Sequence, residues 1–290
     1  MSTPNLASAV PGVPLSAGAS SQVLLQQYAQ AQQSIAMRAA IAIVGMWNRM
    51  IHPDHFNDGW SMLGPLINGI ISTHYEATAA NAAQYYASTR VTSGFGPFTV
   101  PGQDPDMQYI HNVTDAMGPG QFYNYLPNYD SEVASGMARD ALRGASTRMV
   151  MMGGRDTITN AVRTDPVADG WERVIEPGAC GFCAMLASRG AVYKESTVNF
   201  RAHDHCHCVA RAVFAGQKSV NEDLSRAWGT ATAGTRGKAA MQAWNNYWEN
   251  QNGGRQPEGA AAASERGSRN ATVQQESVRQ PALSNQGARL

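Results

Sequence analysis

Apolar residues recur at helical spacing through the first third of the chain. From Ser20 to Met50 they form a broad stripe, with glutamines on the other faces, which predicts an amphipathic helix. His52-Pro53 ends it, because the residue before a proline is disfavoured in the α region. A similar stretch from Trp60 to Arg90 completes a predicted helical hairpin. The expected core residues are Val23, Leu24, Tyr28, Ile35, Met37, Ile41, Val44, Met46 and Trp47, followed by Leu63, Leu66, Ile67, Ile70, Ile71, Tyr75, Tyr85 and Tyr86.

Shorter helices are expected after a Gly- and Pro-rich loop at 93–105. The pattern predicts helices from Asp106 to Met117 and from Ser131 to Met152, with an irregular segment at 118–127 between them. Ser131 is the expected N-cap of the second helix, and Gly153-Gly154 is expected to end it. Another short helix is expected from Asp156 to Val167.

The pattern changes at Gly170, where short alternating stretches replace the helical spacing. A final helix with a Gly-rich middle is then expected, and a tail without aromatic residues follows, which predicts disorder. The elements expected in this part are strands at Trp171–Glu176, Ala191–Tyr193 and Val209–Phe214 and helices at Cys183–Arg189 and Asn221–Asn250. The predicted fold is therefore mainly α with a small α+β C-terminal domain. Its predicted divisions are a flexible arm at 1–18, a helical domain at 19–168, an α+β domain at 169–249 and a disordered tail at 250–290.

The composition argues against some classes of function but does not identify one. Basic and acidic side chains number 22 each, so no net charge attracts the chain to nucleic acid or acidic lipid. Charged residues make up only 15% of the chain, which fits a protein that rests against other proteins. The sequence shows no signal-peptide pattern and no run of ~20 apolar residues, so we expect a cytoplasmic product without a membrane span.

All four cysteines and three of the seven histidines lie within residues 180–208. Cys180 and Cys183 form a Cys-x-x-Cys turn, and Cys206 and Cys208 stand in the run His203-Asp-His-Cys-His-Cys208. Clustered thiols in a reducing compartment favour a metal over disulfides. Two thiolates from one turn and further donors from a second segment are the arrangement of a structural zinc site.

The identity of the last ligands depends on the local backbone. On an extended strand Cys206 and Cys208 share one face and the histidines share the other, which favours four thiolates. If Ala202–His205 is a turn, His203 or His205 can replace a thiol. Unliganded thiols, or a redox-active pair at Cys180 and Cys183, are the alternatives to a metal. A catalytic pairing of Cys206 with His205 or His207 is geometrically poor, because neighbours on a strand point apart.

Other side chains have ordinary interpretations. Four arginines spread over seventeen residues are expected to form a solvated helix face rather than a nucleic-acid surface; they are Arg139, Arg143, Arg148 and Arg155. Trp228, Trp244 and Trp248 have the helical spacing of packing residues rather than of a base-stacking surface.

The cysteine and histidine run, together with the stretch from Cys180 to Tyr193, resembles the MuF-like minor capsid proteins of tailed bacteriophages. The likeness is to the actinobacteriophage type, which is sometimes labelled a capsid maturation protease. It covers about Trp171 to Phe214. In that family a Cys-x-x-Cys turn precedes a His-x-x-Cys-x-Cys element, which falls here on Cys180 and Cys183 and on His203, Cys206 and Cys208. These five residues are the candidate ligands of a structural zinc ion.

The resemblance implies a virion protein inside the procapsid, near the portal vertex, assembled in the host cytoplasm. We expect it to be non-enzymatic, because the residues form no catalytic constellation. Its implied roles are head assembly and DNA packaging or ejection. The implied partners are the portal protein, a major capsid or scaffold protein and packaged DNA. The alternative function is a capsid maturation protease with a Cys/His site, although no catalytic constellation is apparent in the sequence.

Overall fold

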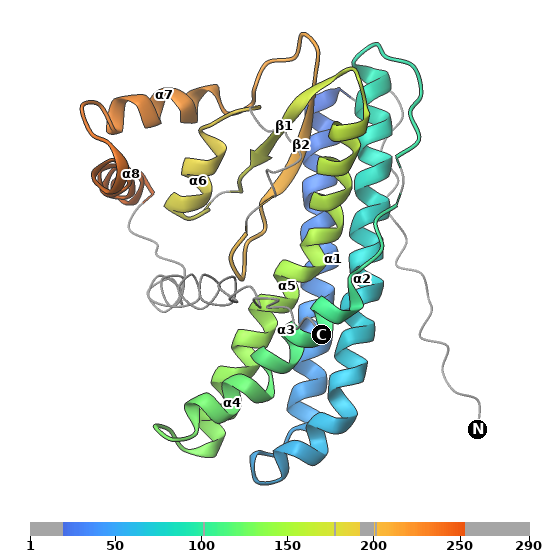
Figure 1. The fold of residues 1–290 in the computed structure, drawn as a ribbon, viewed down its shortest axis with the longest axis vertical. Coiled ribbons are helices and arrows are strands. Elements are labelled where there is room, and N and C mark those ends of the chain that lie inside the picture. The colour runs from blue at the N-terminus through green and yellow to red at the C-terminus, as the bar shows by residue number, and fades with distance from the viewer. Residues whose placement is uncertain (1–19, 101, 177, 192–199, 201, 253–290) are drawn as a thin grey trace, which may run out of the picture.

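The computed structural model of the chain describes residues 20–100, 102–176, 178–191, 200 and 202–252. These residues form a mainly helical fold with one two-stranded sheet, which confirms the predicted fold class (Figure 1). The elements are α1 (Ser21–Met50), η1 (Pro53–His55), α2 (Phe56–Thr92), α3 (Met107–Met117), α4 (Pro119–Tyr125), α5 (Ser131–Thr164), β1 (Ala168–Val174), α6 (Gly181–Ala187), β2 (Val209–Phe214), α7 (Glu222–Ala231) and α8 (Gly237–Gln251). The predicted arm, the tail beyond residue 252 and most of the predicted strand at 191–193 lie outside the described residues.

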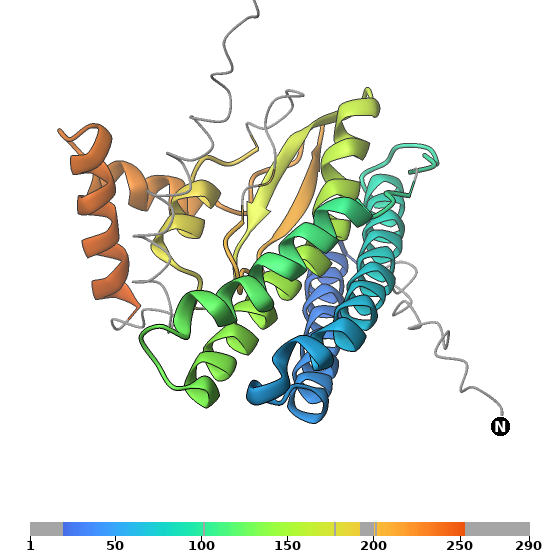
Figure 2. The ribbon, with the colours of Figure 1, turned by 60° about the horizontal axis from the view of Figure 1, so that its bottom comes forward.

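Three long helices, α1, α2 and α5, pack against one another and form the body of the molecule (Figures 1 and 2). Aromatic pairs join α1 to α2 at two levels: Tyr28 of α1 stacks on Tyr85 of α2 with ring centroids 4.3 Å apart, and Trp47 of α1 meets Phe56 of α2 edge-on at 5.7 Å.

None of the described helices combines the length and apolarity needed to cross a membrane.

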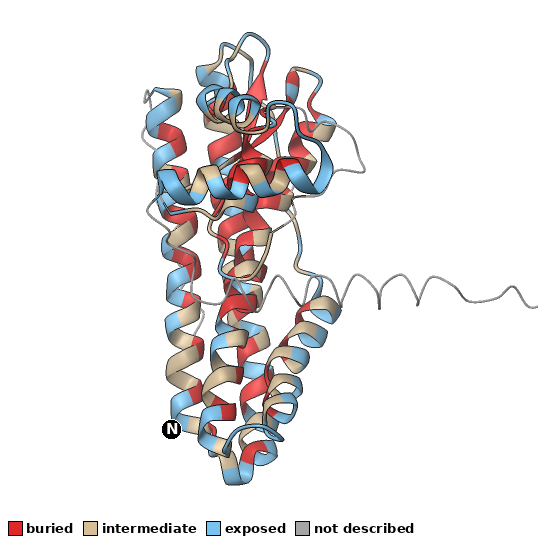
Figure 3. Ribbon diagram, turned by 90° about the vertical axis from the view of Figure 1, so that its left-hand side faces the viewer, coloured by how far each residue is buried: buried red, intermediate tan, exposed pale blue. Residues whose placement is uncertain are grey.

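Most of the predicted core residues, all on α1 and α2, are buried. Buried residues in general lie on the inner faces of the long helices and on the sheet (Figure 3). The prediction is wrong for Val23, Met37, Ile41 and Leu66, which are 40–65% exposed. The apolar stripe in the sequence is wider than the face that each helix can bury against two neighbours. The outermost positions of the hairpin therefore remain at the surface.

Gly153-Gly154 does not end a helix, contrary to prediction, because α5 runs through both residues to Thr164 and includes most of the helix predicted after them. The two glycines lie where the three helices approach closely. A Cβ on Gly153 would lie 2.1 Å from the Tyr75 carbonyl oxygen, and one on Gly154 would lie 2.3 Å from Gln32 Oε1. Glycine in a helix costs about 1 kcal/mol relative to alanine, and here it permits backbone contact.

Three smaller predictions are also corrected. The N-cap of α5 is Asp130 rather than Ser131, and its carboxylate accepts a hydrogen bond from the Val133 amide at 2.9 Å. The segment at 118–127 is not irregular but contains α4, whose buried Phe122 stacks on Phe56 at 4.0 Å. The last predicted helix is two helices, α7 and α8, separated by a turn in which Gly234 has a φ of 73°.

The two strands form an antiparallel pair that rests on α5 (Figure 2). A buried ion pair joins them, because Glu172 of β1 lies opposite Arg211 of β2 and accepts a hydrogen bond from its guanidinium group. Glu172 also accepts hydrogen bonds from the Val220 amide at 3.1 Å and from Asn221 Nδ2 at 3.2 Å. This carboxylate therefore fixes the segment between β2 and α7 to the sheet.

A second buried carboxylate, Asp165, joins the C-terminal ends of α2 and α5. It is 1% exposed, accepts a hydrogen bond from Arg90 Nε at 2.7 Å, and accepts another from the Tyr86 hydroxyl at 3.0 Å. Burial alone would raise the pKa of Asp165, but the hydrogen bonds from Arg90, the Val167 amide and Tyr86 outweigh it and lower the pKa below its usual value. Folding therefore favours the ionised form.

Replacing Asp165 by asparagine is expected to lower the free energy of unfolding at pH 7 by about 2 kcal/mol, because charged hydrogen bonds within the fold are lost. The folded pKa is below the unfolded one, so the contribution is full above the unfolded pKa of about 4 and is lost as the pH falls through the folded value. Urea unfolding at pH 7 and at successively lower pH measures this. The difference between wild type and variant should shrink with acidification, and a pH-independent difference would contradict the account.

Candidate metal centre

Four thiols and one imidazole come together between the start of α6 and the segment that precedes β2. Cys180 is the N-cap of α6, and its sulfur accepts a hydrogen bond from the Cys183 amide at 3.5 Å. Cys206 and Cys208 lie directly before Val209, the first residue of β2. Pairing of β1 with β2 brings the two segments to the same end of the sheet. All four thiols are free, and Cys183, Cys206 and Cys208 are at most 3% exposed.

The donor distances resemble the edges of a metal tetrahedron. Zn–S and Zn–N bonds of ~2.3 and ~2.0 Å imply edges of roughly 3.8 Å between sulfurs and roughly 3.5 Å between sulfur and nitrogen. Cys183 Sγ lies 3.7 Å from Cys206 Sγ and 3.6 Å from His203 Nε2, and the Cys180 Sγ–His203 Nε2 distance is shorter, at 3.0 Å. Two groups of donors lie within 4.8 Å of one another: Cys180, Cys183 and His203, and Cys183, Cys206 and Cys208. Cys183 belongs to both.

The backbone before β2 is a turn rather than an extended strand, which selects His203 among the histidines. The Cys206 amide donates to the His203 carbonyl at 3.2 Å, and His205 has a φ of 62°. The His205 ring lies against α5, where a Cβ on Gly144 would be 2.3 Å from its Nε2. His207 is directed to Glu176, with Nδ1 3.1 Å from Oε1. The structure therefore brings together all five predicted ligands and separates the other two histidines from them.

His203 has the orientation of a metal-ligating imidazole. Its Nδ1 lies 2.7 Å from the Asp204 carbonyl oxygen, and since a carbonyl only accepts, Nδ1 carries the proton. Nε2 of the neutral ring then presents its lone pair to the thiols. The Asp204 carboxylate in turn accepts from Arg148 Nε of α5 at 2.8 Å. The turn that carries His203 is therefore fixed to the bundle.

The pKa values of the thiols and of His203 depart from their usual values because these groups are hydrogen-bonded to one another. Hydrogen bonding from Cys183 lowers the pKa of Cys180 to about 4, and the bond to Cys180 raises the pKa of His203 to about 9. Hydrogen bonds to Cys180, Cys206 and Cys208 raise the pKa of Cys183, whereas the bonds from Cys183 and Cys208 hold that of Cys206 well below its usual range. A bound metal would displace protons from Cys183 and His203. Metal affinity should therefore fall as the pH is lowered.

Two buried arginines beside the thiols were not predicted as part of the site. Arg155, expected on a solvated face, is 1% exposed and donates to the carbonyls of Cys206 at 2.7 Å and Cys208 at 3.0 Å. Arg173 Nη1 lies 3.8 Å from Cys183 Sγ and 3.9 Å from Cys206 Sγ. The guanidinium groups lie 4.8 and 3.8 Å from the ring centroid of Phe200. Such cations stabilise thiolates. The burial of Arg155 could have been inferred from its helical spacing to Met151 and Ile158, which are both buried.

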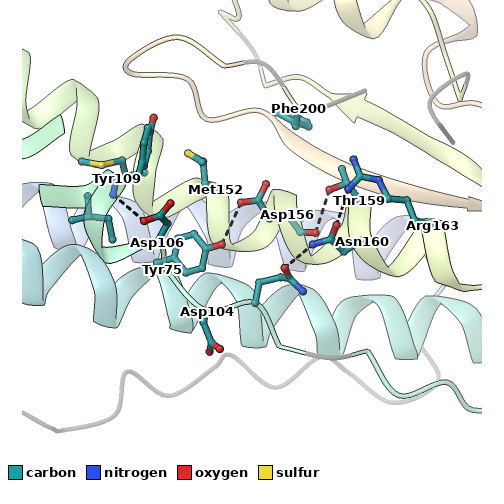
Figure 4. A pocket seen from close by; sticks show the side chains of 13 residues that line it. Tyr75, Asp104, Asp106, Tyr109, Met152, Asp156, Thr159, Asn160, Arg163 and Phe200 are labelled. Carbon is teal, nitrogen blue, oxygen red and sulfur yellow. Dashed lines mark hydrogen bonds between the residues drawn. The ribbon is translucent and has the colours of Figure 1, made fainter. Parts of the chain in front are cut away.

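A hollow of about 300 Å³ lies between α2, α3, α5 and the loop before α3, separate from the ligand side chains (Figure 4). Polar side chains line most of it, and they are hydrogen-bonded to one another: the Tyr75 hydroxyl donates to Asp156 at 3.2 Å, and Asn160 Nδ2 donates to Gln103 Oε1 at 2.6 Å. Burial raises the pKa of Asp156. Phe200 belongs both to the lining of the hollow and to the residues packed against the thiol cluster.

Comparison with known protein families gives a match over most of the chain. The model of a family described as VG15 protein matches residues 19–231, which is well over half of the chain and includes all five candidate ligands. No curated protein matches the chain, and no solved structure matches it.

Proposed function

The chain belongs to the VG15 protein family, a family of phage proteins, and from this premise we propose that it is a non-enzymatic minor capsid protein of a phage head. It would lie inside the procapsid near the portal and assist head assembly, with DNA packaging or ejection as further roles. The family supports a phage structural protein, and the resemblance of the cysteine and histidine run to MuF-like proteins supports the more specific role.

The observation that carries the structural assignment is the burial of the donor cluster. Five donors converge, and three of the four sulfurs belong to residues at most 3% exposed. Catalytic zinc sites keep an open coordination position, whereas structural sites are closed by four protein ligands. We propose that Cys180, Cys183, His203 and Cys206 hold one zinc ion, because Cys183 Sγ lies 3.6 Å from His203 Nε2 and 3.7 Å from Cys206 Sγ, both close to tetrahedral edges, and His203 Nε2 also faces Cys180 Sγ. Cys208 is then a neighbouring thiol.

The zinc ion would act as a staple between segments that are too short to form a core alone. It would connect the start of α6 to the segment before β2, while Arg155 connects that segment to α5. In phage heads, this would keep the C-terminal elements docked on the helical bundle during assembly. The proposed partners are the portal protein, a major capsid or scaffold protein and packaged DNA.

The position in the particle tests this function. Procapsids assembled with tagged chain should carry the label at the portal vertex, and the chain should co-purify with portal protein from lysates of assembling particles. Label spread evenly over the shell, or absent from purified particles, would contradict the proposal. Disruption of the zinc site should reduce incorporation without abolishing expression.

A protease is the second candidate, because Cys180 Sγ lies 3.0 Å from His203 Nε2 and both residues are partly exposed. A thiolate beside a protonated imidazole is the pairing of cysteine proteases. Incubation of the chain with major capsid protein separates the candidates. The structural proposal predicts no specific cleavage, whereas cleavage that is abolished in Cys180→Ala but retained in His205→Ala would establish the protease.

A further inference from the structure

We propose that α8 positions the Cys180 turn of the metal centre, through hydrogen bonds from Trp244 and Trp248. The inference rests on the proposed zinc site and adds an element that lies beyond it. Helix α8 spans Gly237–Gln251, whereas the family match ends at residue 231. Helix α8, which lies outside the family match, would therefore take part in metal binding by residues inside it.

The two indoles donate to carbonyls on either side of Cys180. Trp248 Nε1 lies 2.8 Å from the Ala179 carbonyl oxygen, and Trp244 Nε1 lies 2.7 Å from the Gly181 carbonyl oxygen. Both distances are those of good N–H···O bonds. Because the bonds hold the 179–180 peptide group and the 181–182 peptide group, they restrain the backbone on both sides of Cys180 and with it the direction of its Cα–Cβ bond.

Close packing reinforces these bonds. The Trp244 side chain is fully buried, and it forms a small core with Ala184 and Met185 of α6. A Cβ on Gly181 would lie 2.8 Å from Asn245 Oδ1, so glycine at this position allows α8 to approach the turn. The helix therefore lies directly against the backbone that carries the first two ligands.

The backbone around Cys180 is short and leaves a glycine turn. It follows Gly178, which has a φ of 85°, and leads into a helix of only seven residues. Groups that orient metal ligands without touching the metal typically change affinity 10–100-fold when they are removed. Trp244 and Trp248 are positioning residues in this sense, since they act on the metal through the backbone of Cys180.

The test compares three tryptophan-to-phenylalanine variants of the full chain. Trp244→Phe and Trp248→Phe each remove an indole N–H that bonds to the turn. Trp228→Phe is the matched control, because Trp228 is half-buried in the same cluster and packs on Trp244 at 5.3 Å without a hydrogen bond to the turn. Trp228 and Trp248 are both half-buried, so a purely structural effect should be similar in these two variants, and their comparison is the decisive one.

Zinc affinity, measured by competition with a chromophoric chelator, is the main readout. We expect about a tenfold loss in Trp244→Phe and Trp248→Phe and little change in Trp228→Phe. The cobalt-substituted chain should show altered visible absorption bands in the first two only, which a general loss of stability would not produce. Equal affinities in all three variants would overturn the proposal.

An absence of zinc binding can be told apart from an absence of positioning by α8. If the wild-type chain binds no zinc, the proposed metal centre is wrong, and the rate of Cys180 alkylation by iodoacetamide in the metal-free chain decides the inference. Faster alkylation in Trp248→Phe than in Trp228→Phe supports positioning by α8. The same rate in both contradicts it.

Discussion

Replacing Gly153 by alanine is expected to lower the free energy of unfolding by about 3 kcal/mol or more, since overpacking a tight contact forces the backbone to shift. The added Cβ would lie 2.1 Å from the Tyr75 carbonyl oxygen and 2.5 Å from Thr78 Oγ1. Thr78 cannot easily move, because its hydroxyl lies 2.6 Å from the Val150 carbonyl oxygen, to which it donates. Relief therefore requires α2 and α5 to separate.

Gly136→Ala in the same helix is the control for this prediction. A Cβ there meets nothing within 4 Å, so only the helix propensity changes, and a gain of up to about 1 kcal/mol is expected. Urea or thermal unfolding of both variants gives the comparison. Changes of opposite sign in the free energy of unfolding of the two variants would support close helix contact at Gly153. Changes of the same sign would show that the helices do not approach as described.

Replacing Cys183 by serine is expected to abolish zinc binding and to destabilise the chain. Cys183 belongs to both groups of donors, so its loss leaves neither complete. A ligand that binds only the folded state stabilises it by about 4 kcal/mol when its free concentration is a thousand times the dissociation constant. The expected loss is therefore about 4 kcal/mol in zinc-replete buffer.

Chelation of the wild-type chain should reproduce this effect. Stability of the wild type in excess chelator should fall to that of Cys183→Ser, and chelator should not lower the stability of the variant further. His207→Ala is the matched control, because this imidazole contacts Glu176 and not the thiols, and it should retain zinc. Chelator sensitivity that persists in Cys183→Ser would place the metal elsewhere.

The helices and the ligand cluster could be predicted because their signals are local. The hairpin of α1 and α2 follows from apolar spacing and from His52-Pro53, and β2 was predicted at Val209–Phe214 as found. The spacing of the cysteines was sufficient to group the four thiols, and the resemblance to MuF-like proteins added His203. The fold class is confirmed. The predicted domain division at 168/169 stays a prediction, although one hydrophobic core includes residues of both α5 and the sheet.

What could not be predicted depends on contacts between distant segments. Glycine commonly ends a helix at the surface. Gly153 is instead a packing residue within α5, because Tyr75 of α2 approaches it closely. Arg155 is polar by type, yet the carbonyls of Cys206 and Cys208 make its burial favourable. The choice of His203 over His205 depends on a turn and on Gly144, which no local pattern indicates.

The zinc content of the purified full-length chain tests the central claim most directly. Elemental analysis and native mass spectrometry should find one zinc ion per wild-type chain and none in Cys183→Ser, with His207→Ala unchanged. A wild-type chain without stoichiometric zinc, prepared without chelators under reducing conditions, would contradict the structural metal centre.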